Sequence, residues 1–215
     1  MRPAKTIVGW VAGLHVGESG REDLSKAPRS SVSVELDGLV DDNHRGFSRE
    51  AWEGDKEPEG TVRRNERQWS GMAMEEIAVI ARAMDLDRDL EGADLGTNLC
   101  FEGLPGFSQL PKGSVFVFPS GAKLVAVEYN PPCIEMGAKL AEKYATRSGE
   151  ALTARQFPVA AVGLRGLVGV VDVPGEINVG DEVTVEIWSE ERQVNQPAAA
   201  QSELTAQSGT TGQMT

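Results

Sequence analysis

Short segments in which apolar and polar residues alternate recur along the chain and predict a protein built mainly of strands. Residues 31–36 are the clearest case: Val32, Val34 and Leu36 face one side and polar residues the other. This period of two is typical of a half-buried strand. Residues 6–16 are rich in β-branched residues and contain two interior glycines, which predicts a curved or bulged strand.

Two later segments repeat one unit. Residues 110–117 and 177–185 each place a glycine turn before an alternating strand. Between them, residues 159–173 form a long apolar run with glycines at positions 163, 166 and 169. We expect a strand there, because glycines in long strands mark the bends that close a barrel. Five or six short strands with few helices favour a mainly β protein with a small closed barrel over a layered α/β sheet.

Two stretches predict helices. Residues 70–85 begin with Ser70 as a candidate cap and carry an apolar stripe at helical spacing, formed by Ala73, Ile77, Ile80 and Met84. Residues 123–140 read as a strand that runs into Asn130-Pro131-Pro132, followed by a helix that starts at or beside Cys133. The two prolines fix the backbone there, because each locks its own φ and favours an extended residue before it.

The remaining segments predict loops and a tail. Residues 18–29 read as a loop, residues 38–46 as a polar turn, and residues 47–66 as an irregular stretch. An irregular stretch of that length is usually functional or mobile, unless it is simply an exposed loop. Residues 193–215 contain scarcely any large apolar side chain. We therefore expect one domain at residues 1–190 and a disordered C-terminal tail at residues 191–215.

Composition narrows the classes of partner. The 215 residues include 21 Lys and Arg against 33 Asp and Glu, a formal net charge of −12, which argues against nucleic acid and anionic membrane as partners. No long apolar run predicts a membrane-spanning helix, and the N-terminus has no signal-peptide apolar region. The chain has only two cysteines, Cys100 and Cys133, so we do not expect a disulfide framework. We therefore expect a reducing, cytoplasmic location. The two histidines, His15 and His44, leave no cluster with zinc spacing.

Cys133 is the strongest candidate for chemistry. A cysteine at a helix N-terminus lies beside free N–H groups and the positive end of the helix dipole, which favour the thiolate. Glu135 in the same turn acts in the opposite direction. The alternative is a small buried residue that closes the corner between strand and helix. Cys100, among apolar neighbours, reads as a buried structural thiol.

Three further features could contribute to a site. Asp42 and His44 on one turn could form an acid/base pair, or could be a capping aspartate beside a solvated histidine. Asn98 could hydrogen-bond a bound ring, or could stabilise its own turn. A basic cluster could bind a phosphate or carboxylate, or could pair with the nearby Glu57, Glu59 and Glu66. The cluster consists of Arg63, Arg64, Arg67 and, beside them, Gln68.

Taken in order, these motifs resemble the MOSC domain, the module found at the C-terminus of molybdenum cofactor sulfurases and in small stand-alone bacterial proteins. The matching positions are Gly38, Asp42 and His44; Arg67 and Gln68; Gly96, Asn98, Leu99 and Gly103; Pro132 and Cys133; and Arg165-Gly166 with residues 175–181. The resemblance covers roughly residues 5–188. Two departures are the Thr97 that replaces the family's Glu and a longer stretch between His44 and Arg67.

The resemblance implies a pyruvate-kinase-type β-barrel with two or three peripheral helices and a molybdopterin-type cofactor. It makes Cys133 a sulfur carrier or a molybdenum ligand, and gives Asp42 and His44 an orienting or protonating role. The cofactor would be held by Arg67, Gln68, Asn98, Arg63 and Arg64. A pyridoxal phosphate link is a family association, inherited from fusion with desulfurase-like domains.

Three functions remain open on the sequence. The first is sulfur transfer or cofactor-dependent catalysis through Cys133, of a sulfurtransferase or molybdenum-cofactor-dependent type, with a cysteine desulfurase or redox protein as partner. The second is a metal-free thiol enzyme that cleaves C–S or N–O bonds of a small molecule. The third is a non-catalytic sulfur carrier or binding partner for a larger cofactor-assembly enzyme.

Overall fold

The computed structural model describes residues 2–17, 24–52 and 55–188. The tail predicted at residues 191–215, and with it the domain boundary expected at residue 190, lies outside the described residues.

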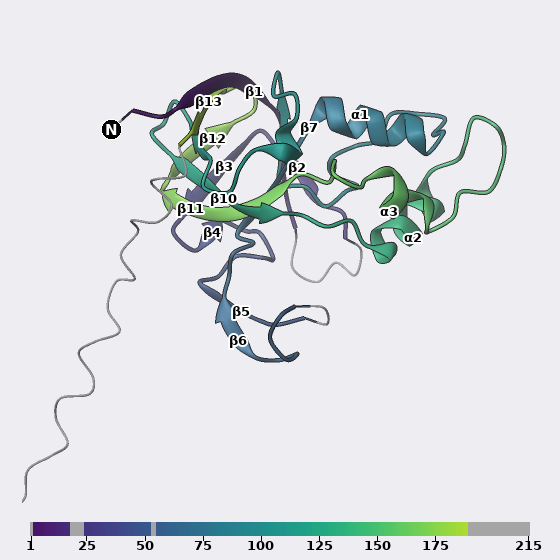
Figure 1. Cartoon of the computed structure of the whole chain (residues 1–215), viewed down its shortest axis with the longest axis horizontal. Coiled ribbons are helices and arrows are strands. Elements are labelled where there is room, and N and C mark those ends of the chain that lie inside the picture. The colour runs from purple at the N-terminus through teal and green to yellow at the C-terminus, as the bar shows by residue number, and fades with distance from the viewer. Residues whose placement is uncertain (1, 18–23, 53–54, 189–215) are drawn as a thin grey trace, which may run out of the picture.

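Seven strands of the described chain close into a barrel, which confirms the expected mainly β fold (Figure 1). Around the barrel they follow the order β13, β9, β10, β11, β7, β8, β1, and β1 pairs with β13 to close the ring. Of these neighbours, β7 and β8 run parallel and the other pairs antiparallel. The strands are β1 (Lys5–Val16), β7 (Trp69–Ala73), β8 (Leu99–Glu102), β9 (Val115–Val117), β10 (Lys123–Tyr129), β11 (Leu167–Val173) and β13 (Glu182–Ile187).

Glycines let the barrel strands bend and approach one another. The register of β1 against β8 shifts between Val11 and Gly13, so the bulge predicted in residues 6–16 is confirmed. At Gly169 on β11, a Cβ would lie 1.9 Å from the carbonyl oxygen of Val125. Only a residue without a side chain fits at that point.

The barrel interior is filled by large aromatic side chains. Trp69, Phe101, Phe107 and Phe116 are all 0% exposed. The ring centroids of the three phenylalanines lie 5.3 to 5.6 Å from one another, and that of Trp69 lies 5.5 Å from Phe116. The barrel is therefore a packed core rather than a pore, and a binding site has to lie at its rim.

Smaller sheets surround the barrel. Strand β2 (Ala27–Arg29) pairs with the end of β1. A three-stranded sheet contains β12, β3 and β4, and β5 and β6 form a hairpin that projects from the barrel in Figure 1. Their bounds are β3 (Ser31–Glu35), β4 (Gly38–Leu39), β5 (Ser48–Glu50), β6 (Val62–Arg64) and β12 (Gly175–Asn178).

Three expectations about this region are wrong. Residues 27–29 are strand rather than loop, and the stretch expected to be irregular carries the β5–β6 hairpin. The two hairpin strands are only three residues long and polar, so they show no alternation that a sequence pattern could reveal. Leu36, expected on the buried side with Val32 and Val34, follows the end of β3 and is 51% exposed.

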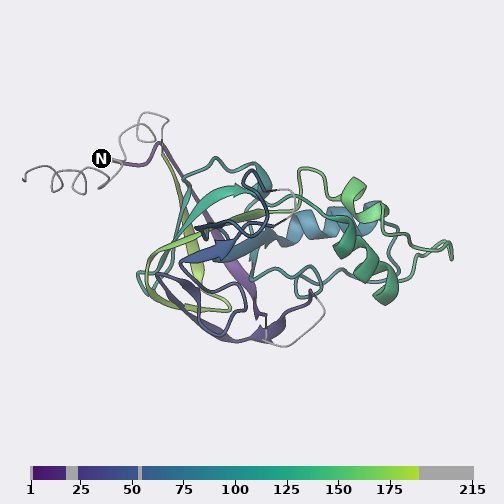
Figure 2. The ribbon, with the colours of Figure 1, turned by 90° about the horizontal axis from the view of Figure 1, so that it is seen from below.

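The helices gather at one end of the barrel (Figures 1 and 2). They are α1 (Met74–Ala83), α2 (Ile134–Lys143) and α3 (Gln156–Ala160). A short 3-10 helix, η1 (Phe107–Gln109), lies between β8 and β9 in the sequence. The helices share a second hydrophobic cluster with Ile77, Ile80 and Met84 from the predicted α1 stripe, Met136 and Leu140 from α2, and Phe157 from α3. The helix predicted after the prolines is confirmed, with Cys133 as its N-cap residue.

Two element boundaries differ from the expectation. Ser70 lies on β7 and does not cap a helix; α1 begins at Met74, after Ala73, which makes no side-chain cap. Only residues 167–173 of the apolar run at 159–173 are strand, because its beginning belongs to α3 and a turn at Gly163 and Gly166 separates the two. In both places tertiary contacts determine whether the residues form helix or strand, and apolar content alone does not predict it.

Candidate functional site

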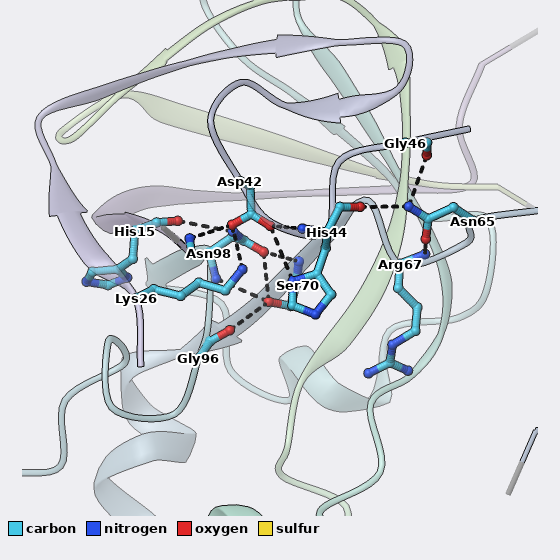
Figure 3. Close-up of polar contacts among 11 residues, drawn as sticks. His15, Lys26, Asp42, His44, Gly46, Asn65, Arg67, Ser70, Gly96 and Asn98 are labelled. Atoms are coloured by element: carbon cyan, nitrogen blue, oxygen red, sulfur yellow. Dashed lines mark hydrogen bonds and ion pairs between the residues drawn. The ribbon is translucent and has the colours of Figure 1, made fainter. Parts of the chain in front are cut away.

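A buried aspartate organises the rim of the barrel (Figure 3). The Oδ2 atom of Asp42 accepts hydrogen bonds from Gly17 N at 2.8 Å, Lys26 Nζ at 2.6 Å and Asn98 Nδ2 at 2.7 Å. Its Oδ1 atom accepts one from His44 N at 2.9 Å and lies 3.3 Å from His44 Nδ1. The Asp42 side chain is 0% exposed, so this carboxylate joins four segments of the chain.

The surroundings keep Asp42 ionised. Burial alone would raise the pKa of its carboxyl, but the hydrogen bond from His44 and the charge of Lys26 outweigh burial and hold the pKa well below its usual range. Because a carboxylate only accepts, His44 presents its Nδ1–H to Asp42 and keeps Nε2 as the free ring nitrogen. The His44 side chain is 43% exposed, so Nε2 can reach a ligand.

The amide of Asn98 is fully used inside the protein. Its Nδ2 group donates to Asp42 and to the carbonyl of His15, and its Oδ1 accepts from the N–H and the hydroxyl of Ser70, each at 3.0 Å. Asn98 therefore ties β1, β7 and the Asp42 turn together, through partners at least 28 residues away rather than within its own turn.

Arg67 lies on the same rim and is positioned by Asn65. The Asn65 Oδ1 atom accepts from the backbone N–H of Arg67 at 3.0 Å, and its Nδ2 donates to the His44 carbonyl at 2.7 Å (Figure 3). The Arg67 guanidinium donates to Asn130 Oδ1 at 2.6 Å, three residues before Cys133. One chain of contacts thus joins His44, Arg67 and the Asn-Pro-Pro-Cys corner.

Cys133 is exposed, which rules out the alternative of a small buried corner residue. Its Sγ atom caps α2 by accepting from Met136 N at 3.5 Å. Cys100, by contrast, is buried, and burial raises the pKa of its thiol to about 12. Of the two cysteines, only Cys133 is available to a ligand or a partner.

Arg165 is the site residue that reasoning from single motifs missed. It is 7% exposed, donates to the Leu95 carbonyl at 2.6 Å and contacts Met72 Sδ at 3.3 Å. Burial lowers the pKa of its guanidinium to about 10. No carboxylate in the described part of the chain forms an ion pair with it, which is rare for a buried charge. In the sequence, the feature that could have indicated this residue is a single arginine inside an otherwise apolar run.

Cys133, Arg67 and Arg165 interact electrostatically. Burial lowers the pKa of both guanidiniums, and the negative charge of a Cys133 thiolate is among the causes that oppose this shift in each. Both arginines therefore lie within electrostatic reach of Cys133, the residue that caps α2.

Arg63, Arg64 and Gln68, also proposed to hold the cofactor, differ in their surroundings. Arg63 forms ion pairs with Asp55 and Glu57 at 3.0 and 2.7 Å, so it fits the pairing alternative. Arg64 is exposed on β6. Gln68 is buried, donates to the Leu36 carbonyl and accepts from Val171 N. Within residues 24–52 and 55–188, no hydrogen bond or ion pair links any of the three to Cys133.

Trp52 lies between His44 and the arginines. Its ring meets His44 edge-on with centroids 6.5 Å apart, and the guanidinium carbons of Arg49 and Arg67 lie 4.0 and 5.8 Å from its centroid. The β5–β6 hairpin thereby brings an aromatic side chain to the rim.

Neither a metal cluster nor a membrane helix occurs in the described residues. Nowhere in them do three His, Cys, Asp or Glu side chains gather as a metal would need. The helices there are also too short or too polar to cross a membrane.

The fold and the site define a class: a closed barrel whose rim carries an Asp–His pair and an exposed cysteine at a helix start. The MOSC domain family model matches residues 50–184. Bacillus subtilis YuaD, provisionally described as a metal-sulfur cluster biosynthesis protein, is 32% identical over 197 residues, covering 90% of this chain and 97% of YuaD. The chain belongs to the MOSC domain family, and Asp42 and His44 precede the matched stretch.

Solved structures agree on the fold. The crystal structure of B. subtilis YuaD has a TM-score of 0.79 at 28% identity and covers 86% of this chain and 99% of that one. The structure of YiiM from Geobacillus stearothermophilus has a TM-score of 0.56 at 16% identity, covering 82% and 74%. The YiiM likeness shows the barrel fold alone.

Proposed function

We propose that this MOSC protein binds a molybdenum cofactor of the molybdopterin type and acts in sulfur transfer or cofactor-dependent catalysis through Cys133. The observation that carries the proposal is the exposed Cys133 thiol at the start of α2, within electrostatic reach of Arg67 and Arg165. The MOSC family is associated with this cofactor. YuaD's provisional description also concerns metal and sulfur.

The residues fit such a cofactor. A thiophilic metal whose other ligands come from the cofactor needs one accessible thiolate from the protein, and Cys133 supplies it. A phosphate group needs cationic donors. Arg165 has no carboxylate ion pair within the described chain, and Arg67, 21% exposed, lies 3.6 Å from the exposed carboxylate of Glu128. When bound, the cofactor would supply two-electron redox chemistry.

Thr97 supports an anionic ligand as well. Its hydroxyl is buried and has no hydrogen-bond partner in the described structure, although the family pattern places a glutamate there. The carbonyl of Leu95, two residues before Thr97, accepts a hydrogen bond from Arg165. Thr97 carries no negative charge, so it adds no carboxylate to this part of the chain.

Sulfur transfer needs only groups of the same rim. The Cys133 thiolate attacks the outer sulfur of a donor persulfide, an S–S bond forms at Cys133, the donor's S–S bond breaks, and the donor leaves as a thiolate. The proton stays on the transferred sulfur, and no external oxidant is needed. A cysteine desulfurase or another persulfide-bearing protein is the proposed donor, because the exposed thiol is open to a protein partner.

Carrier chemistry fits the contacts better than activation by His44. The hydrogen bond of Cys133 Sγ is with Met136 N, and His44 Nδ1 is engaged with Asp42. Within the described chain no hydrogen bond joins His44 to Cys133. His44 would instead act on a bound ligand through Nε2.

The test is to purify the protein without oxygen from a host that makes the cofactor, and to measure molybdenum, pterin fluorescence and protein-bound persulfide. We expect at least one of the three in wild type, its loss in Cys133→Ser, and its retention in Cys100→Ala, the matched control at the buried thiol. Wild type that lacks all three would overturn the proposal. Metal content unchanged by Cys133→Ser would remove the ligand role alone.

A further inference from the structure

A second cleft lies against the helices and shares no residue with the Cys133 rim. It has a volume of about 360 Å³ and lies against α1. Its floor is apolar, formed chiefly by Met74, Ile77, Ala81 and Leu90. Three arginines, Arg82, Arg88 and Arg147, also line it.

The charge of the cleft opposes that of the whole chain. The formal net charge is −12, yet Asp89 is the acid that lines the cleft beside three guanidiniums. Asp85 lies within electrostatic reach of Arg147, but its carboxylate accepts from the N–H of Ser148 at 3.0 Å. Within the described residues, none of the three arginines forms an ion pair with a carboxylate.

The fold places the three arginines around the cleft. Leu86 and Thr146 form an isolated antiparallel bridge, and the Arg147 N–H donates to the Asp85 carbonyl at 2.8 Å. Arg88 donates to the Lys143 carbonyl at 2.8 Å and lies 4.4 Å from the Tyr144 ring centroid. Arg82 comes from the last turn of α1. Three separate segments thus bring their cations to one apolar floor.

We propose that this cleft binds a small organic anion with a carboxylate or phosphate head and a compact apolar body. Guanidinium groups match the planar or multi-oxygen faces of carboxylate and phosphate, and the apolar floor accounts for the body. The volume lies at the lower end of the ~300–1,000 Å³ that small-molecule sites span. This site is independent of the function proposed for Cys133.

The proposal is tested with ligands that share one apolar body. Calorimetric titration of the full chain with 1-naphthyl phosphate, 1-naphthoate and neutral 1-naphthol separates the head from the body. We expect one or both anions to bind and the alcohol to bind at least about tenfold more weakly. The stronger anion identifies the head group. Equal binding of the alcohol, or binding of neither anion, would overturn the proposal.

Variants locate the binding. Arg82→Gln/Arg147→Gln should weaken the anion about tenfold, since each exposed ion pair contributes up to ~1 kcal/mol. Arg155→Gln, at an exposed arginine outside the cleft, is the charge-matched control and should bind as wild type does. Ala78→Phe, on the exposed face of α1 within the cleft, should block binding while the circular dichroism spectrum stays unchanged. Affinity unchanged in both cleft variants, or an equal loss in the control, would contradict the assignment.

Discussion

Replacing Asp42 by asparagine tests the organisation of the rim. The carboxylate accepts from Gly17, Lys26, Asn98 and His44, and its side chain is 0% exposed. Asparagine keeps the shape of the side chain but offers only one oxygen and no charge. Its NH₂ group would face the hydrogen-bond donors that now bind the carboxylate. The Lys26 ammonium, 4% exposed, would lose its counter-charge. Breaking a buried pair in this way costs about 3–5 kcal/mol.

The assay is urea unfolding at neutral pH, followed by far-UV circular dichroism. Asp37→Asn is the matched control, because Asp37 forms a more exposed pair with Arg45, and we expect it to cost less than about 1 kcal/mol. Lys26→Met/Asp42→Asn should recover part of the loss, since it removes the orphaned ammonium. A cost below about 1 kcal/mol for Asp42→Asn would refute the claim that Asp42 is a structural hub.

The same variant has a pH signature. The folded-state pKa of Asp42 is depressed, so its stabilisation is fully present above the ordinary carboxyl pKa of about 3.9 and is lost as the pH falls through the folded value. Between neutral pH and about pH 3, wild type should therefore lose more unfolding free energy than Asp42→Asn does. Equal losses would mean that Asp42 does not contribute to acid sensitivity.

Three further outcomes are expected. In native protein one thiol should react rapidly with a water-soluble thiol reagent and the second only after unfolding, because Cys133 is exposed and Cys100 is 2% exposed; two fast thiols would contradict this. Arg165→Met should slow alkylation of Cys133 about fivefold, the loss of one nearby cation worth ~1 kcal/mol, whereas Arg155→Met should leave the rate unchanged; an unaltered rate in Arg165→Met would exclude its influence on the thiol. Gly169→Ala should lower the free energy of unfolding by about 3 kcal/mol, because the new Cβ would meet a carbonyl oxygen at 1.9 Å; a wild-type urea midpoint would show that the strands can separate.

Local patterns were sufficient for strand β3 beside the barrel and for the helix that begins after Cys133. The alternation of Val32 and Val34 and the stiff Pro131-Pro132 step act on neighbouring residues, so the sequence displays them directly. The apolar stripe that contains Ile77 and Ile80 could also be predicted from the sequence, because helical spacing shows which face of the helix is buried.

Long-range contacts account for most of what the sequence did not reveal. Ser70 has the chemistry of a helix cap, yet it lies on β7 because its hydroxyl and N–H bind Asn98, 28 residues away. The importance of Arg165 depends on Leu95, 70 residues away. Such pairings leave no local sequence pattern, so they can be identified only from the folded structure.

The most direct test of the central claim is to locate a transferred sulfur. Wild type, Cys133→Ser and Cys100→Ala are each incubated with a cysteine desulfurase and cysteine, and their peptides are analysed by mass spectrometry. The account predicts one added sulfur atom on the peptide that contains Cys133 in wild type and Cys100→Ala, and none in Cys133→Ser. Sulfur on the Cys100 peptide, or the same amount of added sulfur in Cys133→Ser, would contradict it.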